Sequence, residues 1–132
     1  MPLPYTVVVA LYCALIFAAS SDPSPPVPDL RFAHADKLLH AGAFGFLALL
    51  VSLGMRASDR LYTPRVQFWA PVLFVAVYGA FDEIHQYFVP MRHCELLDWV
   101  ADVAGALVVQ TALCVGWWRL PPWEGPPSYE RG

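Results

Sequence analysis

Four apolar segments of about 20 residues each dominate this chain of 132 residues. They run from about 3–20, 36–55, 66–88 and 96–118, and polar or proline-rich stretches separate them. A helix needs an apolar stretch of this length to cross the hydrocarbon core of a bilayer. Because lipid offers the backbone no hydrogen-bond partner, such segments must be helical. The sequence therefore predicts an all-α, polytopic membrane bundle of four transmembrane helices.

Composition favours the same class of protein. Hydrophobic residues make up 58% of the chain and charged residues only 14%, against about 25% charged residues in soluble domains. The net charge is −3 and no run of basic residues occurs, so nucleic acid is excluded as a partner. The length allows one domain. We assign it to residues 1–118 and expect the proline-rich segment 119–132 to be a short, disordered cytoplasmic tail.

The first apolar segment has two interpretations. The small residues of Phe17-Ala18-Ala19-Ser20 would suit cleavage after a signal peptide. However, no Lys or Arg precedes the segment, and a signal peptide normally carries one there. We therefore expect the first segment to be a retained transmembrane helix.

Basic residues in the connecting segments indicate an orientation, because cytoplasmic loops carry an excess of Lys and Arg. If both termini are cytoplasmic, the inner face holds Arg56, Arg60, Arg65, Arg119 and Arg131. The outer face then holds Arg31, Lys37 and Arg92. This bias favours cytoplasmic termini, and tryptophans 117, 118 and 123 suit an interfacial aromatic belt.

Polar side chains gather at one end of the predicted helices. Alternate spans run in opposite directions, so the start of the second span, the end of the third and the start of the fourth meet at one face. In the orientation above this is the outer face. Ionisable residues at membrane depth are functional-site candidates by default, since each is costly to insert. The residues concerned are Asp36, Lys37, His40, Asp82, Glu83, His85, Gln86, Arg92, Asp98 and Asp102.

Part of this polarity has simpler explanations. Asp36 suits the N-cap of the second helix, and His93 and Glu95 suit the membrane–water interface. For the deeper residues the alternative to a functional site is a structural ion-pair network that ties three helices together. Lys37 and Arg92 are the expected counter-charges in either case.

The third segment and the turn after it resemble the signature of the VanZ-like family. The matching positions are the acidic pair Asp82-Glu83, followed by His85-Gln86, Pro90 and Arg92, and then Asp98, Asp102 and Gly105. The family pattern has a glycine between the proline and the arginine, where this chain has Met91. A second block, Asp36-Lys37-Leu38-Leu39-His40 followed by Phe44, also matches. The resemblance covers about residues 36–112.

The resemblance implies a small membrane protein of the bacterial cell envelope, in the cytoplasmic membrane. The family is named for a protein associated with resistance to teicoplanin, a lipoglycopeptide, and the resemblance implies no particular reaction. Our first hypothesis is that the chain binds a membrane lipid, a lipid-linked cell-wall precursor or another amphiphile at its outer face. Lys37 and Arg92 would hold a phosphate or carboxylate. The predicted ligand-binding residues are Lys37, Arg92, Gln86, Asp98, Asp36 and His85.

The second hypothesis is an intramembrane hydrolase or transferase that acts on a lipid-linked substrate. Glu83 and Asp102 would be buried carboxylates suited to acid–base catalysis, with His40 or His85 as the base. Of the two histidines, His40 is the predicted catalytic residue. A divalent metal on His40, His85, Glu83 and Asp98 has suitable ligand types. The spacing matches no metal motif, so no metal and no cofactor are predicted. The sequence leaves open whether the chain is an enzyme.

The third hypothesis is a structural membrane scaffold without catalysis. The pairs Ala41 and Gly45, and Ala101 and Gly105, have the spacing that permits close helix contact. A homo-oligomer is compatible with each hypothesis, and a weaker fourth one, a proton-coupled transporter or channel, would require it.

Overall fold

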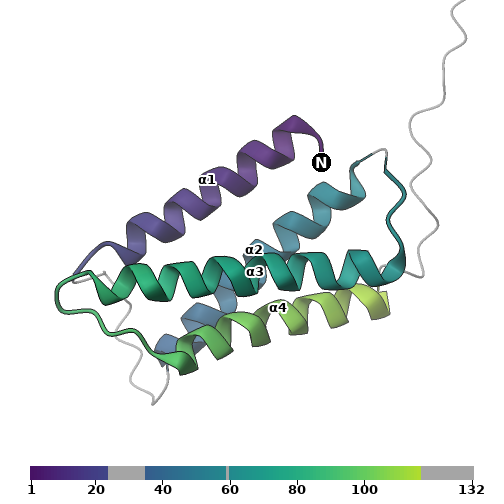
Figure 1. Cartoon of the computed structure of the whole chain (residues 1–132). Helices are drawn as coiled ribbons and strands as arrows, with labels where there is room; N and C mark the ends of the chain where they lie inside the picture. The colour runs from purple at the N-terminus through teal and green to yellow at the C-terminus, as the bar shows by residue number, and fades with distance from the viewer. Residues whose placement is uncertain (24–34, 59, 117–132) are drawn as a thin grey trace, which may run out of the picture.

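The computed structural model describes residues 1–23, 35–58 and 60–116, and within these it contains α-helices and no strand (Figure 1). The helices are α1 (Leu3–Ser20), α2 (Ala35–Arg56), α3 (Pro64–Tyr87) and α4 (Leu96–Gly116). The predicted all-α bundle is confirmed. Helices α2 and α3 begin one and two residues earlier than the apolar segments indicate, at Ala35 and Pro64.

The start of α3 follows ordinary capping chemistry. The side chain of Thr63 accepts a hydrogen bond from the backbone N–H of Val66 at 3.4 Å. Pro64 follows in the first turn, where its missing N–H costs nothing. The polar segment before α3 therefore ends where the sequence supplies a cap.

The turn between α3 and α4 depends on one residue with a positive φ angle. After α3, the backbone N–H groups of Phe88 and Val89 donate to the carbonyls of His85 and Gln86. Met91 then has φ 66°, in the left-handed region. Glycine adopts this conformation without steric cost, which explains why the family pattern has glycine here. This chain makes the same reversal with methionine.

The helices are packed around the contact between α2 and α4, which form the largest helix–helix interface. α3 packs mainly on α4, while α1 lies at the periphery against α2 and, to a smaller extent, α3. Figure 1 shows that the end of α1, the start of α2, the end of α3 and the start of α4 lie at the same end of the bundle. We call this the polar end, for the side chains described below.

Small residues let α2 and α4 approach closely. A Cβ atom added to Gly105 would overlap the carbonyl oxygen of Ala41. A Cβ atom added to Gly45 would lie 3.1 Å from the carbonyl oxygen of Gly105. In lipid the hydrophobic effect does not drive helices together, so such close packing is a main source of attraction. Three of the four small residues expected to support close contact thus lie in this interface.

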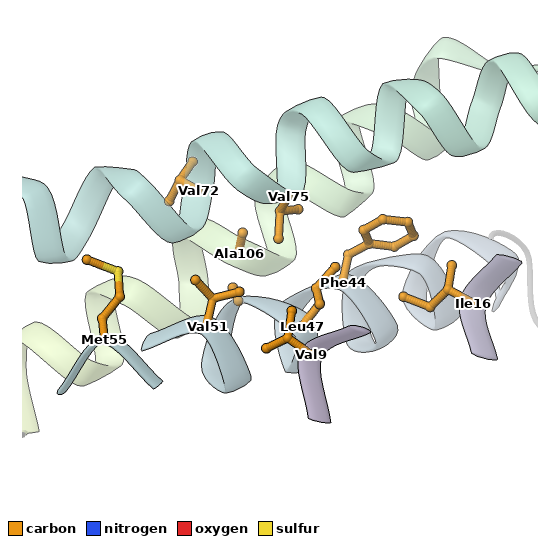
Figure 2. Close-up of a cluster of buried hydrophobic side chains, with 10 residues drawn as sticks. Val9, Ile16, Phe44, Leu47, Val51, Met55, Val72, Val75 and Ala106 are labelled. Atoms are coloured by element: carbon orange, nitrogen blue, oxygen red, sulfur yellow. The ribbon is translucent and has the colours of Figure 1, made fainter. Parts of the chain in front are cut away.

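An apolar core fills the bundle away from the polar end, with Phe44, Leu47 and Val75 almost fully buried (Figure 2). All four helices contribute to it. Its members are Val9, Ile16, Phe44, Leu47, Ala48, Val51, Met55, Val72, Val75 and Ala106.

The outer surface of the bundle is also apolar, as expected of a protein surrounded by lipid. α1, α2 and α4 are long and apolar enough to cross a membrane. α3 has the length, but its hydropathy is lower, since it carries Arg65, Asp82 and Glu83. On α1, the side chains of Leu3 and Leu11 are 76% and 66% exposed, which a water-soluble protein of this size would avoid. The chain is a helical membrane protein.

Several expectations concern residues outside the described part of the chain. These are the proline-rich connection 24–34, the last two residues of the fourth predicted helix at 117–118, the aromatic belt of tryptophans 117, 118 and 123, and the tail 119–132.

Candidate functional site

The polar end brings together ionisable side chains from α2, α3 and α4. The first turns of α2 supply Lys37 and His40, the last turns of α3 supply Glu83, and the start of α4 supplies Asp98 and Asp102. Hydrogen bonds and ion pairs connect α2 with α4 directly. The convergence that the sequence predicts from alternating helix directions is therefore present in the structure.

Lys37 lies at the centre of an ion-pair cluster. Its Nζ atom is 2.8 Å from Asp36 Oδ2, 2.8 Å from Glu95 Oε2 and 2.5 Å from Asp98 Oδ1. An ammonium group has three N–H donors, and three carboxylates occupy them. Lys37 therefore acts as a counter-charge, and it has no donor left for an anionic ligand unless one of these ion pairs breaks.

His40 and Asp102 form a second pair, deeper in the bundle. His40 Nδ1 lies 3.0 Å from Asp102 Oδ1, and Asp102 is fully buried. The His40 ring also lies parallel to that of Phe44, with 6.2 Å between centroids. The other oxygen of Asp102, Oδ2, has no hydrogen-bond partner among the described residues. It lies against Gly79 of α3, where a Cβ atom would approach it to 2.8 Å. The imidazole orientation is therefore set by neighbours from two helices.

Glu83 connects the end of α3 to the start of α4. Its Oε2 atom accepts a hydrogen bond of 2.8 Å from the backbone N–H of Glu95. Its Oε1 atom is buried and has no hydrogen-bond partner in the described structure. The residue is 4% exposed, so one oxygen of this carboxylate is held in place while the other is desolvated and unsatisfied.

Asp82 and Ser20 extend the site to α1. Asp82 is 1% exposed, and its Oδ2 atom accepts hydrogen bonds from Ser20 Oγ at 2.8 Å and from Gln86 Nε2 at 2.9 Å. The four-residue spacing of Asp82 and Gln86 is visible in the sequence, but Asp82 is absent from the predicted catalytic and ligand-binding residues. Nothing in the sequence distinguishes Ser20 from other serines, so the participation of α1 was not foreseen.

His85 faces α1 rather than the carboxylates. Its Nε2 atom lies 2.9 Å from Ser21 Oγ, and its ring stacks on Phe17 with centroids 4.2 Å apart. In the described structure His85 is not among the groups of residues close enough to share a metal ion. It therefore lies outside the group that His40, Glu83 and Asp98 form, and like Arg92 it contacts the end of α1.

Arg92 holds the C-terminal end of α1. Its Nε atom donates to the carbonyl of Asp22 at 3.0 Å, and its Nη2 atom donates to the carbonyl of Ala19 at 3.0 Å. A cation at this place gives carbonyls at and just after the end of the helix a charged donor, and it complements the negative end of the helix dipole. Arg92 thus positions α1 across the polar end, and it also borders the cavity described next.

A cavity of about 210 Å³ opens between α1, α2 and the end of α3. Its lining has two kinds of side chain. The apolar part consists of Ile16, Ala19, Leu39, Ala43 and Phe44. The polar part consists of Ser20, Asp36, His40, Asp82, Gln86 and Arg92. The surface of the cavity is mostly apolar, because Ser20, Asp82 and Gln86 are buried and bonded to one another. An apolar cavity with polar side chains at its border suits a molecule that is itself amphiphilic.

Negative charge dominates the polar end. Lys37 is its central cation, while the guanidinium of Arg92 binds backbone carbonyls. Among the described residues, seven carboxylates lie at this end of the bundle: Asp22, Asp36, Asp82, Glu83, Glu95, Asp98 and Asp102. The sequence hypothesis of an anion held by Lys37 and Arg92 does not anticipate this excess of acid. The negative charge also acts on the nearby thiol of Cys94. Desolvation and the charges of Glu83 and Asp98 raise the pKa of this thiol above its usual value.

These features define a small helical membrane protein with a buried polar site at one end of its bundle. Residues 5–116 match the family model described as VanZ/LLP1, and the chain belongs to that family. The match confirms the resemblance carried by the two motif blocks. No curated protein and no solved structure matches the chain.

Proposed function

We propose that this VanZ-type protein of the bacterial cell envelope binds an amphiphilic ligand at its polar end and thereby contributes to resistance against lipoglycopeptides of the teicoplanin type. The observation that carries the proposal is the cavity between α1, α2 and α3, with an apolar wall beside hydrogen-bonding groups. A membrane-anchored antibiotic and a lipid-linked cell-wall precursor are both amphiphiles of the kind that such a lining accommodates.

The chemistry of the cavity indicates how an amphiphile would lie in it. Leu39 and Ala43 would contact the alkyl part of the ligand, while the more accessible polar side chains of Asp36 and His40 would bind hydroxyl or amide groups of its head. The volume of about 210 Å³ is below the roughly 300–1,000 Å³ of typical small-molecule sites. The cavity would therefore hold a head group or the start of a chain, and the remainder of the ligand would stay in the lipid.

The proposed orientation places this cavity where such ligands occur. Basic residues in the connecting segments favour cytoplasmic termini, which puts the polar end at the outer face of the cytoplasmic membrane. Lipid-linked cell-wall precursors and membrane-anchored glycopeptides are presented at that face. A binding protein there would be able to compete for either molecule.

A pair of alanine substitutions tests the proposal. Ala43→Leu places a larger side chain in the cavity wall, and Ala104→Leu makes the same change at an exposed position of α4. We expect purified Ala43→Leu in nanodiscs to bind fluorescently labelled teicoplanin at least about tenfold more weakly than the wild type, with Ala104→Leu unchanged. In a susceptible host, Ala43→Leu should lose resistance to teicoplanin. Equal binding and resistance for both variants would contradict the proposal.

A second candidate function is favoured by the His40–Asp102 pair, 3.0 Å apart beside the cavity. A buried carboxylate that orients an imidazole is the arrangement of a general base. His40 would take a proton from water or a hydroxyl group during hydrolysis or transfer of a lipid-linked substrate. Incubation with undecaprenyl diphosphate in nanodiscs should then release phosphate. Asp102→Asn should lower kcat about 100-fold or more, with KM little changed.

The hypothesis of a structural scaffold without catalysis predicts different results for the same experiments. If the ion pairs only hold the helices in register, wild-type protein should neither turn over undecaprenyl diphosphate nor bind labelled teicoplanin. Asp102→Asn would then change stability alone.

A further inference from the structure

Three potential metal ligands converge at the polar end from three different helices. One ligand atom each from His40 of α2, Glu83 of α3 and Asp98 of α4 lies within 4.8 Å of the other two. In a tetrahedral zinc site with bonds of about 2.1 Å, ligand atoms lie about 3.4 Å apart. Small side-chain movements would bring these three atoms to that separation.

The state of Glu83 points independently to a ligand. Its Oε1 atom is buried without a hydrogen-bond partner in the described structure. An unsatisfied buried acceptor costs about 1–3 kcal/mol, and a buried carboxylate oxygen is among the costlier cases. The backbone N–H of Glu95 holds the second oxygen at 2.8 Å, so the carboxylate cannot simply turn toward water. A bound cation would satisfy the free oxygen without disturbing this hydrogen bond.

The surroundings of His40 resemble those of a metal ligand. The fully buried Asp102 holds the ring through Nδ1 at 3.0 Å. Histidines that bind metals usually have their other ring nitrogen engaged by a carboxylate or carbonyl, which fixes the tautomer and strengthens the ligand. Because Nδ1 is engaged by Asp102, Nε2 is the ring nitrogen that we assign to the cation.

We propose that His40, Glu83 and Asp98 form a binding site for a divalent transition-metal ion of the Zn²⁺ class. One imidazole and two carboxylates are suitable ligands for such an ion. Three protein ligands leave at least one coordination position open to water or to a bound molecule. This inference goes beyond amphiphile binding and does not depend on it. It is an alternative to the role of His40 as a general base, because an imidazole with Nε2 bound to a metal has no nitrogen left to accept a proton.

A neighbouring group of carboxylates serves as an internal control. Asp36, Glu95 and Asp98 also lie close enough together to share an ion. The ammonium group of Lys37 already occupies their centre, with contacts of 2.5–2.8 Å. Only Asp98 belongs to both groups. Glu95→Gln therefore removes a nearby carboxylate side chain without removing a proposed metal ligand.

Metal titration of the purified, full-length protein tests the site. Protein stripped with a chelator should bind one Zn²⁺ per chain, measured by competition with a chromophoric chelator and by elemental analysis after dialysis. His40→Gln and Glu83→Gln should each weaken binding about 100-fold, and Asp102→Asn about tenfold, as outer-shell partners do. Glu95→Gln should bind Zn²⁺ within about threefold of the wild type. Loss of binding in Glu95→Gln with retention in His40→Gln would overturn the proposal.

A measurement on the wild type covers the case in which a variant does not fold. X-ray absorption of the zinc-loaded protein should show one imidazole and otherwise oxygen neighbours. Sulfur in the coordination sphere would assign the ion to a cysteine such as Cys94 instead and would overturn the proposed ligand set. Absence of stoichiometric Zn²⁺ from wild-type protein at micromolar zinc would overturn the site itself. Neither result depends on whether teicoplanin binds in the cavity.

Discussion

Gly105 of α4 lies against the backbone carbonyl of Ala41 in α2 so closely that a Cβ atom at position 105 would overlap the carbonyl oxygen. This contact determines the distance between the two helices that carry most of the site. His40 precedes Ala41 directly, and Asp102 lies nearly one turn before Gly105. The close approach of the backbones is therefore what brings His40 Nδ1 within 3.0 Å of Asp102 Oδ1.

The first prediction concerns this contact. Gly105→Ala should lower the free energy of unfolding by about 1–3 kcal/mol, because the added methyl group forces the helices apart. Gly42→Ala is the matched control, since a Cβ atom there has no neighbour within 4 Å. Denaturant titration of both variants in mixed micelles measures the difference. Equal stability of the two variants would show that α2 and α4 are not in close contact.

The second prediction concerns Lys37. Lys37→Met leaves three carboxylates without their shared cation, and two of them, Asp36 and Glu95, are partly exposed to solvent at 59% and 50% of their side-chain area. The exposed pairs contribute little, so most of the effect comes from the mostly buried Asp98. We expect a loss of about 2 kcal/mol in unfolding free energy. Lys37→Arg retains the charge and should lose less than half as much unfolding free energy. Denaturation of the two variants, recorded with a chelator present, measures the difference.

The third prediction concerns Arg92 and the attachment of α1. Arg92→Met removes both hydrogen bonds to the carbonyls of Ala19 and Asp22. α1 has the weakest contact with the rest of the bundle, so amide hydrogen exchange should rise at its C-terminal end while α4 stays protected. Arg65→Met, at the exposed start of α3, should leave exchange in α1 unchanged. Unchanged exchange at the end of α1 in Arg92→Met would mean that other contacts hold the helix.

The fourth prediction concerns Met91. A left-handed conformation costs a residue with a side chain about 1–2 kcal/mol, while glycine loses about 0.5–1 kcal/mol through backbone entropy. Met91→Gly should therefore stabilise the protein by about 0.5 kcal/mol. His93→Gly lies in the same connection, without a positive φ angle, and should be destabilising. Thermal melts that shift in the same direction for both variants would contradict this account of the turn.

Several features of the fold and the site could be predicted from the sequence. The length of the apolar segments predicts the helices, and the alternation of their directions predicts that Lys37, Glu83 and Asp98 meet at one end. Helix periodicity places Asp98 and Asp102 on one stripe, and both are buried in the structure. These inferences succeed because each depends on local chain geometry together with the thickness of a membrane.

Other features required the tertiary structure. The pairing of Ser20 with Asp82 and that of Ser21 with His85 depend on where α1 lies, and no periodicity in α1 indicates which helix it will contact. The roles of Lys37 and Arg92 could not be predicted by counting charges either. Three carboxylates share the ammonium group of Lys37, and the guanidinium of Arg92 binds backbone carbonyls at the end of α1.

The sequence by itself determined that this is a helical membrane protein whose ionisable residues are concentrated at one end, since hydrophobicity and helix period are properties of the chain read along its length. The tertiary structure alone decided which of those residues become partners. Partner choice depends on distances between helices, and small residues such as Gly105 set these distances through contacts between segments far apart in the sequence. A buried oxygen without a partner, as in Glu83, is visible only when all its neighbours are in place.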